Sequence, residues 1–369
     1  MSVEGTRFGR YRLQQLLGEG GMGQVYRAYD TGTDRVVAVK VLHAHVAADP
    51  VFRERFRREA KAAAALGDPH VVPIFDYGEI EGRLFMCMQF LDGEGVDALL
   101  ARSGPMPVGD AVSVLTQAAA GLGAAHTAGL VHRDVKPSNL FITANGFVYL
   151  IDFGIARAAG ETGLTSIGST IGTLAYMAPE RFTTGIADAR ADVYALACVL
   201  FELLTGHPPF PVAAVEQQIA SHLTEPPPRL SLIRPEVGTG IDAVIARGMA
   251  KDPGQRYQRA TDLAAAAAVS IGTGSPTAAS RTRVVAGARG LSRSVPGKAA
   301  AGPRPGQRSP RRPLRIIGII GFTVTALAVT GAALAIPWLR GHAAHQPPTP
   351  HPTATIPVGQ EPTGHHPRR

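Results

Sequence analysis

One change of hydrophobic pattern divides the first 270 residues of this chain into two regions. Residues 8–90 contain short β-branched runs separated by turns, with one helical segment around residues 49–66. Residues 108–270 contain long helical patterns rich in Ala and Leu, such as residues 111–128 and 191–205. Alternating short runs predict strands, and long periodic runs predict helices. We therefore expect an α+β fold, with a small β-rich lobe (about residues 8–90) before a larger helical lobe (about residues 91–265).

A glycine-rich segment (residues 17–25) lies between two strand-like runs of the first region. Its glycines have the spacing G-x-G-x-x-G-x-V, which lets the backbone approach phosphates without obstruction by Cβ atoms. An ordinary glycine-rich turn would look similar, so both interpretations stay open for the segment alone. A dinucleotide-binding turn is disfavoured because residues 25–29 resemble a strand and not a helix. The segment consists of Leu17, Gly18, Glu19, Gly20, Gly21, Met22, Gly23, Gln24 and Val25.

Lys40 follows on a strand-like run with apolar neighbours. A lysine in this position is often a solvated charge at a strand end. After a glycine-rich segment, it can also act as a point charge on nucleotide phosphates. A carboxylate must then hold the cation in place, and both Glu54 and Glu59 in the next helical segment are candidates.

The second region contains a loop (residues 131–139, the 131–139 loop) with three kinds of functional side chain. Asp134 can orient an attacking hydroxyl and accept its proton, and Lys136 can neutralise a transferring phosphoryl group. Asn139 can ligate a divalent metal together with Asp152, which lies at a strand end before Phe-Gly. Further along, Ala-Pro-Glu contains Glu180, a candidate loop anchor whose distant partner is predicted to be Arg256. Five such motifs in this order are not expected by chance.

By these motifs, residues 8–265 resemble a bacterial (actinobacterial-type) transmembrane serine/threonine protein kinase of the eukaryotic-like kind. The resemblance implies a bilobal protein-kinase fold and transfer of the ATP γ-phosphate to protein Ser/Thr hydroxyls. It implies ATP and Mg²⁺ (or Mn²⁺) as ligands. Val135 departs from the family pattern, in which Leu is more usual, and the change in volume is mild.

The resemblance also implies a role for each matching residue. The glycine-rich segment would cover the nucleotide, Lys40 would contact its phosphates, and Glu59 would pair with Lys40 better than Glu54. Asp134 would be the catalytic base. Residues expected at the adenine pocket are Ala38, Met88, Gln89, Leu91 and Phe141. Residues expected in structural roles are Thr173, Glu180, Asp192 and Arg256.

The segment between Asp152 and Ala-Pro-Glu is rich in Gly, Ser and Thr and has few apolar residues. A phosphate on this segment could pair with Arg133, whose planar fork binds anions, and so activate the enzyme. A second copy of the chain would add it in trans. The candidate phosphosites are Thr165, Ser166, Ser169 and Thr170, with Thr165 favoured and Thr170 next.

The basic charge of the chain is concentrated near one apolar segment. Residues 271–315 hold ten Lys/Arg and no Asp/Glu, whereas residues 1–270 hold 24 basic and 28 acidic residues, a net charge of −4. This balance argues against nucleic-acid binding. Residues 316–339 carry no charged side chain and are long enough to span a bilayer, although a buried helix is the alternative. We predict a disordered basic linker (271–315), one transmembrane helix (316–339) and a short disordered tail (340–369).

The positive charge before the predicted span favours a cytoplasmic domain of residues 1–270 and a tail outside the cell. Cys87 and Cys198, which have no metal-ligand spacing, agree with a reducing compartment. The expected partners are protein substrates, a second copy of the chain as a dimer, and anionic lipid headgroups. The lipid contacts are assigned to Arg304, Arg308, Arg311, Arg312 and Arg315.

Other function classes compete with this interpretation. A pseudokinase acting as a membrane scaffold is disfavoured by the presence of Lys40, Asp134, Asn139 and Asp152. A small-molecule phosphotransferase is disfavoured by the Gly-Thr and Ala-Pro-Glu motifs near Thr173, and tyrosine specificity is disfavoured by Lys136 and Thr173. Irregular spacing argues against metal binding by the tail histidines, which are His342, His345, His351, His365 and His366.

Overall fold

The computed structural model describes residues 5–154, 171–185, 187–211 and 214–272. Apart from Ile271 and Gly272, which end a helix, the predicted linker lies outside the described residues. The predicted membrane span and tail also lie outside them, as do Thr165, Ser166, Ser169 and Thr170. In the described ranges, no helix combines the length and apolar character that a membrane crossing requires.

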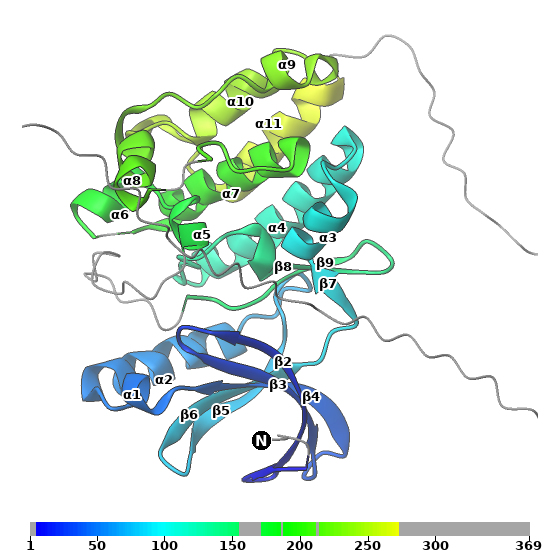
Figure 1. The fold of residues 1–369 in the computed structure, drawn as a ribbon, viewed down its shortest axis with the longest axis vertical. Helices are drawn as coiled ribbons and strands as arrows, with labels where there is room; N and C mark the ends of the chain where they lie inside the picture. The colour runs from blue at the N-terminus through cyan, green and yellow to red at the C-terminus, as the bar shows by residue number, and fades with distance from the viewer. Residues whose placement is uncertain (1–4, 155–170, 186, 212–213, 273–369) are drawn as a thin grey trace, which may run out of the picture. The chain divides into compact units, whose positions relative to one another are not determined.

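The first lobe is built on a six-stranded antiparallel sheet with the strand order β1-β2-β3-β4-β6-β5 (Figure 1). The strands are β1 (Arg7–Phe8), β2 (Tyr11–Gly20), β3 (Gly23–Asp30), β4 (Arg35–Leu42), β5 (Ile74–Ile80) and β6 (Arg83–Gln89). Two helices follow β4, namely α1 (Ala44–Ala47) and α2 (Pro50–Ala64). Asp49 caps α2 by accepting a hydrogen bond from the backbone amide of Val51, and Pro50 occupies the first turn, where its missing N–H costs nothing.

Side chains of β4 alternate between two hydrophobic clusters. Val37, Val39 and Val41 belong to the cluster on one face of the sheet, whereas Ala38 and Leu42 belong to the main core. Because side chains alternate along a strand, Lys40 shares the face of Ala38 and Leu42. This alternation directs the lysine toward the region between the lobes.

The second lobe consists mainly of helices, with a small sheet at one edge (Figure 1). The sheet has the order β7-β8-β9, with β7 at Gly93–Gly95, β8 at Leu140–Thr143 and β9 at Val148–Leu150. The helices are α3 (Val96–Ser103), α4 (Val108–Thr127), α5 (Ile171–Leu174), α6 (Pro179–Thr183), α7 (Ala189–Thr205), α8 (Val215–Thr224), α9 (Leu230–Ile233), α10 (Gly240–Gly248) and α11 (Ala260–Gly272). Three short 3-10 helices lie at Pro137–Asn139, Pro235–Val237 and Pro253–Gln255. The predicted order, a β-rich lobe before a helical one, is confirmed.

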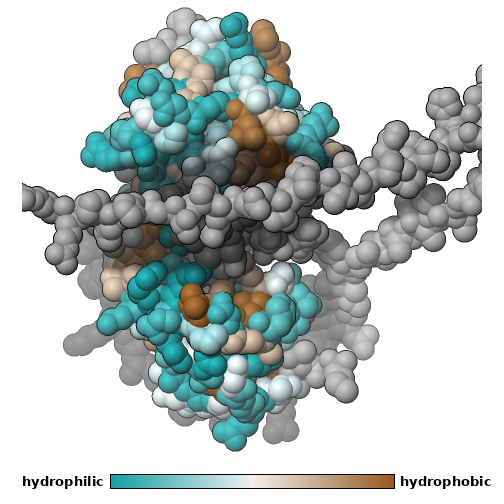
Figure 2. All heavy atoms as spheres, turned by 90° about the vertical axis from the view of Figure 1, so that its left-hand side faces the viewer, coloured by the Kyte–Doolittle hydropathy of each residue, from teal (hydrophilic) through white to brown (hydrophobic). Residues whose placement is uncertain are grey.

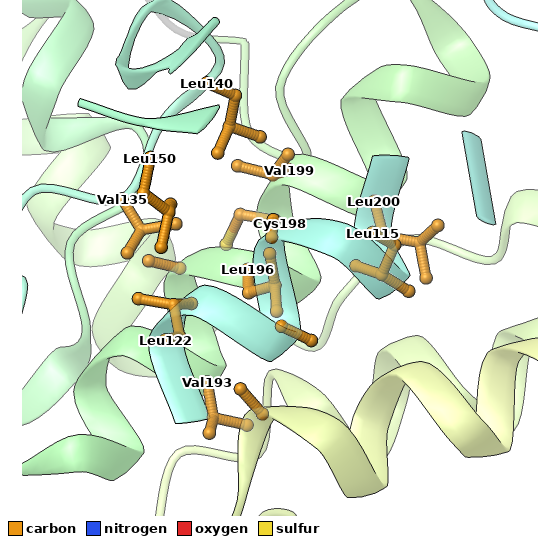
Figure 3. Packing of buried hydrophobic residues seen from close by; sticks show 14 of the residues in the cluster. Leu115, Leu122, Val135, Leu140, Leu150, Val193, Leu196, Cys198, Val199 and Leu200 are labelled. Carbon is orange, nitrogen blue, oxygen red and sulfur yellow. The ribbon is translucent and has the colours of Figure 1, made fainter. Parts of the chain in front are cut away.

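Helix α7 is the centre of the second lobe. Almost all of its side chains are buried, which is typical of a core helix surrounded by other helices. Figure 3 shows its side chains, including Leu196 and Leu200, packed with Leu115 and Leu122 of α4. The helix begins after Asp188, which accepts a hydrogen bond from the Arg190 amide, and ends at Thr205, before Gly206, whose φ of 81° suits glycine. A rigid α7 provides a fixed base for the residues that it presents to the site.

Hydrophobic side chains are concentrated in the core, and the surface is mostly polar. Figure 2 shows a face that is mostly hydrophilic in its described parts, with small separate hydrophobic patches.

Cys87 and Cys198 are both unpaired and buried. Burial raises the pKa of Cys87 to about 11 and that of Cys198 further. Both thiols therefore stay protonated near neutral pH, so they serve as packing groups.

Candidate active site

Asp192 of α7 fixes the backbone of the 131–139 loop. Its two carboxylate oxygens accept hydrogen bonds from the amides of His132 (2.8 Å) and Arg133 (2.9 Å), and the His126 imidazole lies 2.8 Å from Oδ2. Arg133 has a φ of 64°, a left-handed conformation that is uncommon for a residue with a side chain. The buried carboxylate thus holds the loop in a shape that the chain would otherwise adopt rarely.

Asp134 is surrounded by the other polar groups of the loop. Its Oδ2 atom lies 3.0 Å from the Lys136 ammonium and accepts a hydrogen bond of 3.1 Å from the Asn139 amide. The same ammonium donates to the Thr173 hydroxyl, 3.2 Å away, in α5. The structure therefore brings Asp134, Lys136, Asn139 and Thr173 together, although Thr173 is distant in sequence.

Lys40 and Glu59 are both near the site, but their pairing differs from the expected one. The Lys40 ammonium contacts the Asp152 carboxylate, whereas Glu59 accepts a 2.9 Å hydrogen bond from the Arg133 guanidinium. Glu59 is only 6% exposed, and a carboxylate so deeply buried requires a cation. Arg133 meets this need, which leaves Lys40 to pair with Asp152.

The Asp152 carboxylate is placed by its backbone and by Lys40. Its φ is 59°, and only Ile151 separates it from the end of β9 at Leu150. The Ile151 amide donates a 3.0 Å hydrogen bond to the Asn139 carbonyl. Desolvation alone would raise the pKa of Asp152, but the Lys40 ammonium outweighs it and holds this pKa below its usual value. Asp152 is therefore an anion at neutral pH, as a metal ligand must be.

The chemistry of Asn139 and Asp152 fits a magnesium ion. The Asn139 NH₂ group donates to the Asp134 carbonyl (2.7 Å), so the amide oxygen of Asn139 is not used in that bond. Mg²⁺ prefers oxygen ligands and is usually bound by one or two protein groups together with phosphates and waters. No cluster of three or more His, Cys, Asp or Glu side chains suited to a metal occurs within the described residues. An ion held by Asn139 and Asp152 would take its remaining oxygen ligands from phosphates and waters.

The glycine-rich segment forms the hairpin between β2 and β3, with Gly20 paired to Gly23. A Cβ atom added at Gly18 or Gly20 would meet no atom within 4 Å, so these positions face open space. At Gly23 a Cβ would lie 2.3 Å from the Val41 carbonyl oxygen, so only glycine fits there. The hairpin therefore combines an open face with a close backbone contact to β4.

The residues expected around adenine are contributed by both lobes. Ala38 on β4 pairs in register with Met88 on β6, and both side chains are buried in the main core. Gln89 ends β6 and donates its backbone N–H to the Pro73 carbonyl at 2.9 Å. Leu91 packs against the same core, and Phe141 lies on β8 opposite Gly95.

The buried Arg256 forms a bidentate ion pair with the partly buried Glu180. The two guanidinium nitrogens of Arg256 lie 2.8 and 2.7 Å from the two carboxylate oxygens of Glu180. Arg256 also donates to the carbonyls of Ala250 (2.7 Å), Arg190 (3.0 Å) and Lys251 (3.1 Å). One side chain thereby connects α6 to the start of α7 and to the segment after α10.

Three further contacts at the site have no signal in the sequence. His126 reaches Asp192 across 66 residues, and Arg181 donates to the Arg133 carbonyl at 2.6 Å. Tyr176 donates its hydroxyl to the Glu202 carboxylate, and burial raises the pKa of Glu202. Each contact joins residues far apart in sequence. Asp192 and Arg133 are singled out in the sequence, but their partners His126 and Arg181, like Glu202, lie outside the short motifs. Only the folded chain shows them.

The two-lobed fold and the 131–139 loop fixed by α7 define the protein kinase class. The family model described as "Protein kinase domain" matches residues 11–263, and the chain therefore belongs to this family. The structure of the PknI kinase domain of Mycobacterium tuberculosis is similar, with 34% sequence identity and a TM-score of 0.60. The match covers 73% of this chain and 98% of that one.

Curated relatives show the same family at higher identity. The chain is 50% identical over 272 residues to the serine/threonine-protein kinase PknE of M. tuberculosis, covering 74% of this chain and 48% of PknE. It is 53% identical over 264 residues to PknD of the same species, covering 71% of this chain and 40% of PknD. The chain thus spans less than half the length of these relatives.

Proposed function

We propose that this chain is an active serine/threonine protein kinase that transfers the γ-phosphate of ATP to Ser and Thr hydroxyls of proteins. The observation that carries the proposal is the contact set of Asp134, Lys136 and Thr173, in which a carboxylate, an ammonium and a hydroxyl meet. Similarity to serine/threonine-protein kinases, at 50% and 53% sequence identity, supports Ser and Thr hydroxyls as the acceptors.

In this proposal, Asp134 orients the attacking hydroxyl and accepts its proton. Lys136 neutralises charge on the transferring group. Lys40 binds phosphate oxygens, and Asn139 and Asp152 hold Mg²⁺ or Mn²⁺, which neutralises phosphate charge. The pseudokinase scaffold is not favoured, because all of these side chains are present and lie at one site.

We propose that phosphate on the 164–171 segment activates the enzyme through Arg133. Arg133 binds Glu59 in this structure, so a phosphate would compete for the same guanidinium. Glu59, once released, would be available to Lys40, and Asp152 would then be available to a metal. Thr165 and Thr170 remain the favoured acceptors, with a second copy of the chain as the donor enzyme.

The purified full chain, incubated with labelled ATP, Mg²⁺ and a general acceptor such as casein, tests both proposals. We expect phosphoserine and phosphothreonine in the acceptor, and mass spectrometry should find phosphate within residues 164–171. Lys40→Met should abolish both signals without a loss of folding. Alanine at Thr165 and Thr170 should lower the activity toward casein. Full activity of an unphosphorylated chain would contradict the activation proposal, and absence of transfer would contradict the kinase proposal.

We further propose that residues 316–339 anchor the kinase domain at the cytoplasmic face of a membrane. The supporting observation is their lack of charged residues, together with the ten Lys/Arg of residues 271–315 beside them. The basic residues would also bind anionic lipid headgroups.

Protease treatment of intact spheroplasts checks this topology. Externally added protease should remove only residues after 339, whereas lysis should expose the kinase domain. An antibody against the domain reports both results. Digestion of the domain in intact spheroplasts would contradict the orientation, and release of the domain by a salt wash would contradict a spanning anchor.

A further inference from the structure

The end of strand β2, which leads into the glycine-rich segment, makes few packing contacts. Residues 15–20 of β2 are all exposed, and Gly18 and Gly20 face open space. Residues 15–20 form backbone hydrogen bonds with β3 alone. The strand on the other side, β1, has only two residues and pairs with the opposite end of β2. The end of this hairpin therefore needs another contact to stay in one position.

His43 supplies that contact from the end of β4. Its backbone N–H donates to the Met22 carbonyl (3.0 Å), and its imidazole Nε2 lies 3.2 Å from the Gly20 carbonyl oxygen. Within the described part of the chain, no other side chain from outside the hairpin hydrogen-bonds to residues 15–20. Because a carbonyl oxygen can only accept, Nε2 must carry the proton in this bond.

The position of His43 relates the hairpin to Lys40. His43 follows Leu42, which pairs with Gly23, and Lys40 on the same strand pairs with Val25. The turn between Gly20 and Gly23 is thus attached through Gly20 on one side and through Gly23 on the other to β4 and the residue that follows it. Strand β4 also carries Lys40. A displacement of the tip would change the distance between the hairpin amides and Lys40.

We propose that His43 is a positioning residue, which holds the glycine-rich segment in place for binding the phosphates of a nucleoside triphosphate through its Nε2–H bond to Gly20. This proposal rests on the proposed kinase function and deepens it. His43 touches the hairpin and not the reacting groups, so it acts through the segment. The neutral Nε2–H tautomer and the imidazolium both donate, so the effect does not require a charge.

Kinetics of three variants test the proposal. His43→Ala should raise the KM for ATP about three- to ten-fold, the range expected for one net hydrogen bond, with little change in kcat or in the KM for the protein acceptor. His43→Gln keeps an amide donor and should restore the KM for ATP. His45→Ala is the matched control, because His45 stacks on His43 (5.5 Å between ring centroids) and is exposed, without a bond to the hairpin.

Hydrogen exchange on the nucleotide-free full chain gives a readout that does not depend on activity. Amides of residues 18–25 should exchange faster in His43→Ala, and at the wild-type rate in His43→Gln and His45→Ala. This result would support the proposal even for a chain without kinase activity. Unchanged exchange in His43→Ala would overturn it. Equal effects of His43→Ala and His45→Ala, or failure of His43→Gln to restore the KM, would also overturn it.

Discussion

Asp134→Asn is expected to reduce phosphoryl transfer at least ~10²-fold, which is the usual contribution of a positioned general base. The amide has the shape of the carboxylate but cannot accept the proton of an attacking hydroxyl. Nucleotide binding should persist, because the residues assigned to ATP lie on other elements. A single-turnover assay of transfer, together with equilibrium binding of ATP, measures the two effects separately.

The surroundings of Asp134 make the expected effect specific to chemistry. The asparagine could still accept hydrogen bonds from Lys136 and Asn139 through its oxygen, so the 131–139 loop should keep its shape. Its backbone would remain fixed by Asp192, which contacts the neighbouring amides of His132 and Arg133. The melting temperature should therefore stay close to that of the wild type.

A carboxylate outside the site provides the control for this variant. Asp262 forms an exposed pair with Arg259 three residues earlier, and Asp262→Asn should leave the rate of transfer near the wild-type value. A comparable loss in both variants would show that the effect is not due to a base. Near-wild-type transfer in Asp134→Asn would refute the role of Asp134.

Local patterns explain how much of the fold could be predicted. The helical patterns at 111–128 and 191–205 correspond to α4 (Val108–Thr127) and α7 (Ala189–Thr205), because periodicity over long helices is recorded in the sequence itself. The sheet of β7, β8 and β9 could not be predicted as a unit. Its strands have three or four residues, and β7 pairs with β8 across a stretch that includes α3 and α4.

In the candidate site too, residues in short motifs could be predicted, whereas contacts between residues far apart in sequence could not. Short motifs identify Asp134, Asn139 and Asp152 as chemical groups, since their residue types at these spacings suit phosphoryl transfer. They do not determine which cation Glu59 binds. Lys40 and Arg133 can pair with Glu59 and Asp152 in two ways. Which pairing forms depends on where α2 places Glu59 relative to Arg133. In this structure Arg133 binds Glu59 and Lys40 binds Asp152, a result that no motif contains.

Arg256→Ala is expected to destabilise the domain by about 3–5 kcal/mol, the cost of removing the fully buried partner of an ion pair that is mostly shielded from water. Arg256 is fully buried, so the deletion would leave the Glu180 carboxylate and three backbone carbonyls without their donor. For a domain of this size, the loss corresponds to a decrease of roughly 6–20 °C in the unfolding midpoint. Thermal and urea unfolding of the full chain measure it.

Two further variants separate the ion pair from the packing of the side chain. Glu180→Gln keeps most of the volume and should cost less than Arg256→Ala, since the guanidinium retains its three carbonyl partners. A double-mutant cycle of the two positions should give a coupling free energy above about 1 kcal/mol, because residues in one hydrogen-bonded network are not additive. Additive effects would contradict a direct energetic link between Glu180 and Arg256.

Arg259 is the matched control for Arg256, since the two arginines are close in sequence and differ in burial. Arg259 is 75% exposed and pairs with Asp262, so Arg259→Ala should change the stability by less than about 1 kcal/mol. The contrast follows from solvation. Water can solvate Asp262 once Arg259 is removed, whereas the side chain of Arg256 is fully buried. Equal destabilisation by the two substitutions would show that burial of the Glu180–Arg256 pair is not what stabilises the connection between α6 and α7.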